Sequence, residues 1–430
     1  MLFVIYFLFI AGLEVSLSYR LSNRDSPDTH HCWNGIGPND FYIICYFTDW
    51  SSYRQGEGQF EPKDINGAPC THVIYSFGDL KEDTLDAFVP VDQKKAIEEG
   101  FINQVTSQKK NGLKVMFSVG GWGDSKRQYS KMLGDPELRA KVVKQTTEFL
   151  TEWNFDGLDV AIDFPKAYLG QLNSGSSEDK INFVRFLKEL RNSFDAKKSK
   201  MGEEDKLLLS IAVSADSKFI DAYYDVPSIA EICDWINVMP YNYRGSWNNR
   251  TGLMAPFSVQ PGDEGPLLEY NFESAMNLWL MKGAPAEKLT GGLTSFGHSY
   301  VLVNEQKHTI NSPANGIPEP GEFTQDVTSG ALAFYEILDR VLKRGWTSVH
   351  MNYLGSYAYK DNQWIGYDDV FDIATKSFYV KINCFRGVTF WNLDLECFQA
   401  DCPTGKYPLI KAASDTLKDK KALQEFQNLT

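Results

Sequence analysis

The chain has 430 residues, of which 43% are hydrophobic and 23% are charged, a composition typical of globular proteins. It contains 43 Lys and Arg residues against 56 Asp and Glu residues, so the formal net charge is −13. This balance argues against binding to nucleic acids or to anionic membrane surfaces, whereas a neutral ligand remains compatible with it.

The chain begins with a short apolar run at residues 2–13, followed by Glu14 and by the small residues Ser16 and Ser18. The run is too short to span a bilayer, and small residues of this kind precede signal-peptidase cleavage sites. We therefore expect a secretory signal peptide at residues 1–18 and an N-terminal extension at residues 19–40. The mature protein is expected to be extracellular.

Eight short apolar runs alternate with helical patterns along the rest of the chain. The runs lie at residues 41–47, 71–77, 113–119, 157–162, 207–213, 235–239, 289–293 and 387–391. Between them, Asp135 followed by Pro136 marks a helix start, and apolar residues three or four apart give residues 183–194 one apolar face. Strands alternating with helices predict an α/β fold, a closed TIM (β/α)8 barrel at residues 41–415, with a tail at residues 416–430.

The interval between the seventh and eighth runs is longer than the others. It holds polar, strand-like segments at residues 356–360 and 364–367, and then a helical pattern near residues 370–381. We interpret residues 299–385 as a small α+β insertion that forms one wall of a cleft.

Seven cysteines are typical of an oxidising compartment, and their odd number leaves at least one thiol unpaired within the chain. Cys45 and Cys70 lie in or beside neighbouring strand-like runs, so we expect a disulfide between them, worth about 3 kcal/mol by loop closure. Cys397 and Cys402 are a second candidate pair, and Cys233 is predicted to be a buried free thiol. The sequence leaves open the partners of Cys32, Cys384, Cys397 and Cys402.

Other motifs add little chemistry. Two Asn-x-Thr tripeptides, at Asn249 and Asn428, are acceptors for N-linked glycosylation if the chain is secreted. The glycine-rich run at residues 120–123 lacks the spacing of a dinucleotide-binding fingerprint, and the six histidines include no pair at metal-ligand spacing beside an acid. We therefore expect no metal and no cofactor, and a monomer that binds neither nucleic acid nor membrane.

The segment at residues 155–165 is the most informative about chemistry. Side chains alternate along a strand, so Asp159, Ala161 and Asp163 share one face, and the apolar residues between them share the other. The apolar face should meet the helices, and the other face should point into the barrel with Asp163 nearest its C-terminal mouth, where barrel enzymes carry out chemistry. A structural role in ion pairs or caps is the alternative, but unpaired carboxylates inside a barrel are costly and are usually retained for a function.

This segment resembles the acidic signature of glycoside hydrolase family 18, the chitinases and chitinase-like proteins, which reads Asp-Gly-x-Asp-x-Asp-x-Glu. Other runs resemble family motifs in the expected order, and together they span residues 42–409. They lie at residues 45–50, 72–77, 118–122, 239–245, 291–297 and 357–369, with Trp391 on the last strand. The ordered set is specific, and it implies a barrel with a sugar-binding cleft at its mouth.

Three positions depart from the family pattern where catalysis would occur. The final Glu of the signature, which protonates the leaving oxygen, is Asp163, whose shorter side chain withdraws the carboxyl by roughly 1 Å. The preceding Asp, which orients the substrate acetamide that acts as nucleophile, is Ala161, and the sixth-strand Asp is Asn242. We therefore expect no catalytic residue in the degenerate motif, which consists of Asp156, Asp159, Ala161 and Asp163.

The resemblance also implies a surface that binds sugar, because a neutral aminosugar needs flat apolar faces and a few fixed donors and acceptors. The residues expected to line the central sugar subsite are Tyr46, Phe77, Trp122, Asp163, Met239, Tyr241, Asn242 and Trp391. The candidates to extend the groove are Trp50, Tyr53, Trp247, Phe296 and Trp364.

The function predicted from these residues is that of a secreted chitinase-like protein, a lectin that binds chitin or chito-oligosaccharides without efficient hydrolysis. One alternative is a weakly active family 18 glycosidase in which Asp163 still acts as the acid. Another is a secreted signalling or structural protein that uses the same barrel without a sugar site. Ala161 is the feature that separates the first two hypotheses.

Overall fold

The computed structural model describes residues 40–81, 84–109, 112–121, 126–162, 176, 178–201, 206–325 and 330–419. The expected signal peptide, the glycosylation acceptor Asn428 and two of the site candidates, Trp122 and Asp163, lie outside the described residues.

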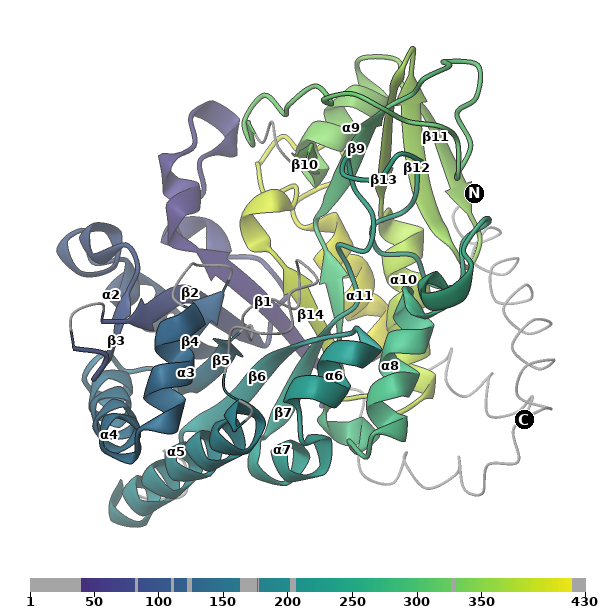
Figure 1. Ribbon diagram of the computed structural model, residues 1–430. Coiled ribbons are helices and arrows are strands. Elements are labelled where there is room, and N and C mark those ends of the chain that lie inside the picture. The colour runs from purple at the N-terminus through teal and green to yellow at the C-terminus, as the bar shows by residue number, and fades with distance from the viewer. Residues whose placement is uncertain are drawn as a thin grey trace.

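Eight parallel strands form a closed barrel in the order β1-β14-β8-β7-β6-β5-β4-β2, and β2 pairs back onto β1 (Figure 1). They are β1 (Tyr42–Thr48), β2 (His72–Leu80), β4 (Lys114–Gly121), β5 (Gly157–Ile162), β6 (Leu208–Ser214), β7 (Trp235–Met239), β8 (Leu289–Thr294) and β14 (Gly387–Trp391). A short strand, β3 (Phe88–Pro90), pairs antiparallel with β2. All eight predicted strands are present, so the predicted TIM barrel is confirmed.

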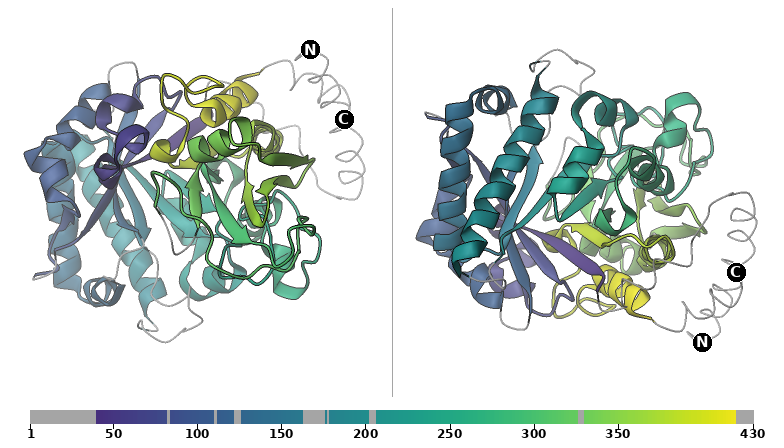
Figure 2. Two further views of the ribbon diagram at one scale, coloured as in Figure 1. Left: turned by 90° about the horizontal axis from the view of Figure 1, so that it is seen from above. Right: turned by 90° about the horizontal axis from the view of Figure 1, so that it is seen from below.

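Helices surround the barrel on its outer side (Figures 1 and 2). They are α2 (Phe101–Thr106), α3 (Lys126–Gly134), α4 (Pro136–Glu152), α5 (Asp179–Met201), α6 (Ser217–Tyr223), α7 (Val226–Ile232), α8 (Phe272–Met281), α10 (Val370–Ile382) and α11 (Pro408–Lys418). Asp135 caps α4 as predicted, because its carboxylate accepts hydrogen bonds from the backbone N–H groups of Glu137 and Leu138. The predicted apolar face of α5 is buried, and consists of Phe183, Leu187, Leu190 and Phe194.

The barrel closes where the first and last strands meet. β1 and β14 pair in parallel register from Tyr42 opposite Gly387 to Cys45 opposite Phe390. Figure 2 shows the yellow C-terminal segment beside the purple first strand, and α11 contacts both β1 and β14. The two distant ends of the described chain therefore stabilise one seam.

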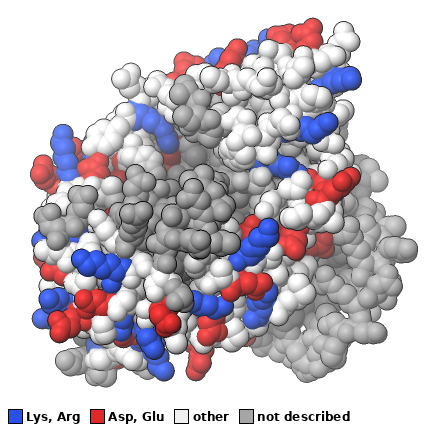
Figure 3. All heavy atoms as spheres, in the orientation of Figure 1, with Lys and Arg blue, Asp and Glu red and all other residues white. Residues whose placement is uncertain are grey.

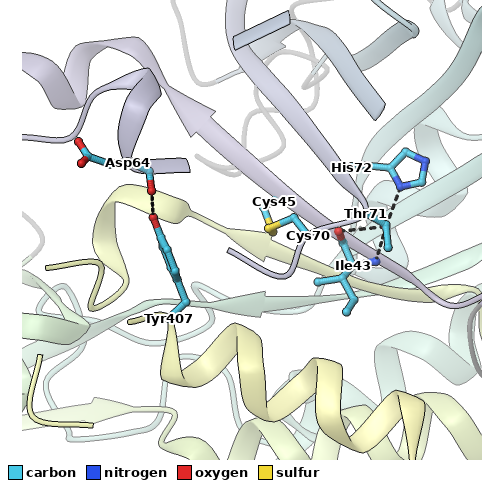
Figure 4. Close-up of a disulfide and its surroundings, with 7 residues drawn as sticks. All are labelled: Ile43, Cys45, Asp64, Cys70, Thr71, His72 and Tyr407. Carbon is cyan, nitrogen blue, oxygen red and sulfur yellow. Dashed lines mark hydrogen bonds between the residues drawn. A yellow bond between two sulfur atoms is a disulfide. The ribbon is translucent and has the colours of Figure 1, made fainter. Parts of the chain in front are cut away.

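The predicted disulfide between Cys45 and Cys70 is present and joins β1 to the segment that leads into β2 (Figure 4). Its two Cα atoms are 6.1 Å apart. Beside it, Oγ1 of Thr71 accepts a hydrogen bond of 2.8 Å from the N–H of Ile43 and lies 2.8 Å from Nδ1 of the buried His72. These contacts hold the first two strands together at the N-terminal end of the barrel.

The other described cysteines are one further expected disulfide, one half of another and the expected free thiol. Cys397 and Cys402 form the second expected disulfide, with Cα atoms 5.9 Å apart. Cys384 is also disulfide-bonded. Cys233 is a buried free thiol, and burial raises its pKa.

A second sheet, of five antiparallel strands, lies between β8 and β14 in the chain and stands above the barrel in Figure 1. Its elements are β9 (Phe296–Val301), β10 (Ala331–Ala333), α9 (Phe334–Leu342), β11 (Thr347–Met351), β12 (Gly355–Lys360) and β13 (Gln363–Tyr367). This sheet is the expected α+β insertion, with shifted borders. β9 follows almost directly on β8, so the insertion starts earlier than residue 299, and α10 packs on β8 and β14 as a helix of the barrel.

The surface is mixed in charge. On the face shown in Figure 3, Lys and Arg side chains are interspersed with Asp and Glu among the described residues, without a large area of one sign. Within the described ranges, no helix combines the length and the apolar character that crossing a membrane requires.

Candidate functional site

A pocket lies at the C-terminal ends of the barrel strands. Its described lining consists of Tyr46, Phe77, Gly121, Ala161, Ala212, Met239, Tyr241, Asn242 and Trp391. Six of the eight residues predicted for the sugar subsite are therefore brought together, and the other two, Trp122 and Asp163, lie outside the described residues. None of the described residues of this lining is charged, which suits a neutral ligand.

Aromatic rings form one wall of the pocket. Phe77 and Trp391 are stacked, with ring centroids 5.7 Å apart and planes inclined by 18°. The ring centroids of Tyr46 and Trp391 are 5.2 Å apart, and the ring of Trp50 stacks on that of Phe77 with centroids 6.1 Å apart. Because Trp50 is 40% exposed, this aromatic surface runs from the pocket to the solvent. Such flat apolar faces are the surfaces on which a sugar ring stacks.

Asp159 lies beneath the pocket, fully buried, on the inward face of β5 that the alternation predicted. Its Oδ2 accepts hydrogen bonds of 2.8 Å from the hydroxyls of Tyr46 and Ser118. Its Oδ1 accepts from Ser210 Oγ at 2.6 Å and from Asn237 Nδ2 at 3.1 Å. All four donors are neutral, and burial raises the pKa of the Asp159 carboxyl although these hydrogen bonds oppose the shift.

Ala161, two residues further along β5, occupies the position at the pocket itself. On the neighbouring strand β6, Ile211 is the partner of Val160, so the next residue, Ala212, lies beside Ala161. Both alanines line the pocket. A methyl group offers no oxygen to orient an acetamide and no charge to stabilise a developing cation. This part of the pocket therefore offers a ligand apolar contact and carries no carboxylate.

Asn242 connects the pocket to the insertion. Its backbone adopts a left-handed conformation with φ of 62°, and its Oδ1 lies 3.0 Å from Nε2 of His298 on β9. The His298 ring is buried between Trp247 at 5.2 Å and Phe296 at 5.5 Å, both in edge-on contact. The wall thus contains an Asn–His pair at a position where the family motif has an Asp.

The candidates for an extended groove separate into exposed and buried residues. Trp50, Tyr53 and Trp247 are 40%, 56% and 53% exposed, as an open binding surface requires. Phe296 is buried and packs with Tyr241 and Trp391, so it supports the pocket from behind.

The prediction that Trp364 extends the groove is wrong. Trp364 is fully buried in the insertion, where it stacks on Tyr357 at 5.2 Å and donates a hydrogen bond of 3.0 Å from Nε1 to the carbonyl oxygen of His308. The alternation of β13 turns this ring toward the core that the insertion forms with its own strands.

Asp156, the first acid of the signature, lies outside the pocket lining at the start of β5. One of its oxygens accepts a hydrogen bond of 2.7 Å from the N–H of Val115 on β4. The other lies 3.1 Å from Nζ of Lys109 and 3.4 Å from Nζ of Lys114. Asp156 therefore has a structural role, because its contacts join β4 to the start of β5.

Sequence reasoning missed the polar cluster that holds Asp159. Ser118, Ser210 and Asn237 are each buried on a different strand, and Thr290 and Thr389 donate hydrogen bonds of 2.7 and 2.8 Å to Oδ1 of Asn237. The available signal was a single polar residue at the centre of an apolar run, as in residues 207–213 and 235–239. Such a residue is expected to have a buried polar partner.

The fold agrees with the comparisons to known proteins. Residues 42–396 match the model of glycosyl hydrolases family 18. The chain belongs to this family. Probable chitinase 10 of Drosophila melanogaster is 38% identical over 389 residues, which cover 90% of this chain but only 16% of that relative.

Solved structures of family 18 relatives superpose on nearly the whole described fold. Catalytic domain 2 of the Group II chitinase of Ostrinia furnacalis has a TM-score of 0.82 and 35% identity, covering 88% of this chain and 97% of that one. Human YKL-39 is described as a pseudo-chitinase with retained chitooligosaccharide binding properties. It has a TM-score of 0.78 and 32% identity, and the match covers 88% of this chain and 100% of that one. Because these relatives include a chitinase and a pseudo-chitinase, the activity must be argued from the residues of the site.

Proposed function

We propose that this family 18 chain is a secreted protein that binds chitin or chito-oligosaccharides without hydrolysing them efficiently. The observation that carries the proposal is the combination of an aromatic pocket with a methyl group, that of Ala161, at the inward position of β5. The pocket supports binding, and the methyl group argues against catalysis.

The loss of catalysis follows from the chemistry of the family reaction. The substrate's own acetamide is the nucleophile, so a carboxylate is needed to orient it and to support the positive charge that develops. Asp159 cannot supply this carboxylate from its observed position, because both of its oxygens already accept two hydrogen bonds each. The signature also ends in Asp163 instead of Glu, which shortens the acid. Electrostatic terms of this kind are worth about 3–4 kcal/mol each.

The proposal of binding rests on the rings and the neutral lining. The stacked Phe77 and Trp391, with Tyr46 beside them, offer apolar faces, and Asn242 and Tyr241 offer polar groups at the same pocket. The relative YKL-39, with its retained chitooligosaccharide binding, supports this ligand class. Secretion is proposed from the apolar run at residues 2–13 and from the disulfides of the barrel.

The proposal is tested by measuring binding and turnover on the same preparation of the full chain. Titration with a chito-oligosaccharide should change tryptophan fluorescence saturably, whereas a cello-oligosaccharide of equal length, which lacks acetamide groups, should not. Prolonged incubation should release no shorter sugar. Turnover that the substitution Asp163→Ala abolishes would instead show a weak glycosidase, and a folded protein that responds to neither sugar would favour a signalling or structural role.

A further inference from the structure

Three side chains of metal-ligating type meet away from the sugar pocket, between the insertion and α10. Figure 1 shows the two elements that carry them, β11 and α10. His350 lies on β11, the edge strand of the five-stranded sheet, and Asp369 and Asp372 lie at the N-terminus of α10. We propose that His350, Asp369 and Asp372 bind a divalent transition-metal ion of the Zn²⁺ class, which links the insertion to the barrel. No metal is expected from the sequence, which does not reveal this cluster because only folding brings His350 to the two aspartates.

The distances from His350 to the two carboxylates match those between ligands of one ion. Nδ1 of His350 lies 3.2 Å from Oδ2 of Asp369 and 3.4 Å from Oδ1 of Asp372. Bonds of about 2.1 Å to nitrogen and oxygen place two ligand atoms about 3.0 Å apart at a right angle and about 3.4 Å apart at the tetrahedral angle. Both distances from His350 are therefore compatible with a single ion, and all three ligand atoms lie within 4.8 Å of one another.

Backbone hydrogen bonds orient both carboxylates toward the imidazole. Oδ1 of Asp369 accepts from the N–H groups of Phe371 and Asp372 at 2.8 and 3.0 Å, which leaves Oδ2 facing His350. Oδ2 of Asp372 accepts from the N–H of Asp369 at 3.0 Å, which leaves Oδ1 facing the same ring. Ser356 Oγ, 3.0 Å from Asp369 Oδ2 and 3.1 Å from His350 Nδ1, offers a further oxygen. Ligands held in this way lose little freedom when they bind a metal.

The charges in this region also favour a cation. The neighbouring Asp368 is neutralised by the buried Lys376, whose Nζ lies 2.5 Å from Asp368 Oδ2. Among the ion pairs of the described residues, Asp369 and Asp372 have only His350 as a basic partner. A metal binds the neutral form of the imidazole, so the ligand set carries the charge of the two carboxylates alone. Their side chains are only 21% and 4% exposed, and buried charge of one sign is unfavourable without a counter-charge, which a cation would supply.

The donor set indicates the class of ion. One imidazole and two carboxylates suit Zn²⁺ and its first-row neighbours, whereas Ca²⁺ takes six to eight oxygen ligands and Mg²⁺ is bound through oxygens and water. The His350 side chain is 27% exposed, so an ion can enter from solvent. A water molecule or Ser356 would complete the four-fold coordination.

The experiment is calorimetric titration of the metal-stripped full chain with Zn²⁺ alone. We expect one equivalent to bind at this cluster, and the substitutions His350→Gln and Asp372→Asn each to weaken that equivalent at least about tenfold. Asn at position 372 can still accept the N–H of Asp369, so this variant keeps the helix cap and remains informative if His350→Gln fails to fold. The matched control is His308→Gln, a histidine of the same insertion that stacks on Tyr359 and is absent from the cluster.

The same variants give a second readout by thermal unfolding. Zn²⁺ should raise the midpoint of the wild type and of His308→Gln but not that of Asp372→Asn. Unchanged Zn²⁺ affinity in both cluster variants would show that the ion binds elsewhere and would overturn the proposal, as would a wild type without saturable binding. Neither result bears on sugar binding, which uses a separate pocket.

Discussion

The hydroxyl of Tyr46 donates a 2.8 Å hydrogen bond to Oδ2 of Asp159 and thereby joins the wall of the pocket to the interior of the barrel. The ring of Tyr46 lies beside that of Trp391, and its hydroxyl donates to a carboxyl that is fully buried. The acid that remains in the middle of the family signature is therefore part of the barrel's internal hydrogen-bond network, whereas the position next to the pocket is Ala161.

Removal of the Tyr46 hydroxyl should destabilise the fold more than it alters the pocket. We expect Tyr46→Phe to lower the free energy of unfolding by about 1–3 kcal/mol, because a buried carboxyl loses one of its four donors. Urea denaturation at pH 7 measures this change. Tyr53→Phe is the control, since Tyr53 is 56% exposed and should shift stability by less than about 0.5 kcal/mol. Equal effects of the two substitutions would refute the role assigned to the network.

Trp391 should be the main ring for sugar binding. We expect Trp391→Ala to weaken chito-oligosaccharide binding at least about tenfold, because the variant loses the ring that stacks on Phe77 at the pocket. Isothermal calorimetry measures the affinity, and circular dichroism verifies the fold. Trp153 follows α4 just before β5, at the opposite end of the barrel, so Trp153→Ala should leave the affinity unchanged. A wild-type affinity in Trp391→Ala would place the sugar elsewhere.

His72 should make the fold less stable in mild acid. Burial, together with the nearby Arg386 and Lys114, lowers the pKa of His72 from 6.5 to about 3. Because the unfolded chain binds the proton more readily, the stability that neutral His72 contributes is complete above pH 6.5 and is lost as the pH falls toward 3. Between pH 7.5 and 5 this amounts to about 2 kcal/mol.

The contribution of His72 is isolated by comparison with His72→Asn, which cannot acquire a proton in this range. Urea denaturation of both chains at pH 7.5 and 5 gives the difference in the free energy of unfolding at each pH. This difference should move by about 2 kcal/mol in favour of the variant at the lower pH. Parallel pH profiles for the two chains would show that His72 is not held neutral.

The barrel could be predicted from the sequence because its strands are buried on both faces. Each strand is then a continuous apolar run, and the runs at residues 157–162, 235–239 and 387–391 coincide with β5, β7 and β14. The predicted site residues that line the pocket stand at the ends of such runs or just after them, where a parallel barrel gathers them. Alternation within β5 also placed Asp159 inside.

Features that depend on how separate sheets pack could not be predicted. Trp364 lies on a short strand that carries large apolar side chains on both faces, and only the packing of the insertion decides that its ring is buried. The cluster of His350 with Asp369 and Asp372 forms between an edge strand and a helix N-terminus, so its members have no regular spacing in the chain. Asp156 belongs to the signature by spacing, but its lysine partners come from the segment around β4.

The rate of hydrolysis of a fluorogenic chito-oligosaccharide tests the central claim most directly when it is compared between two double variants. Ala161→Asp with Asp163→Glu restores the acids of the family signature, whereas Ala212→Asp with Asp163→Glu places the new carboxylate in the same pocket from β6. We predict negligible turnover for the wild type and the second variant, and a gain of at least about a hundredfold for the first. Equal rates in the two double variants, or wild-type turnover that depends on Asp163, would contradict the account.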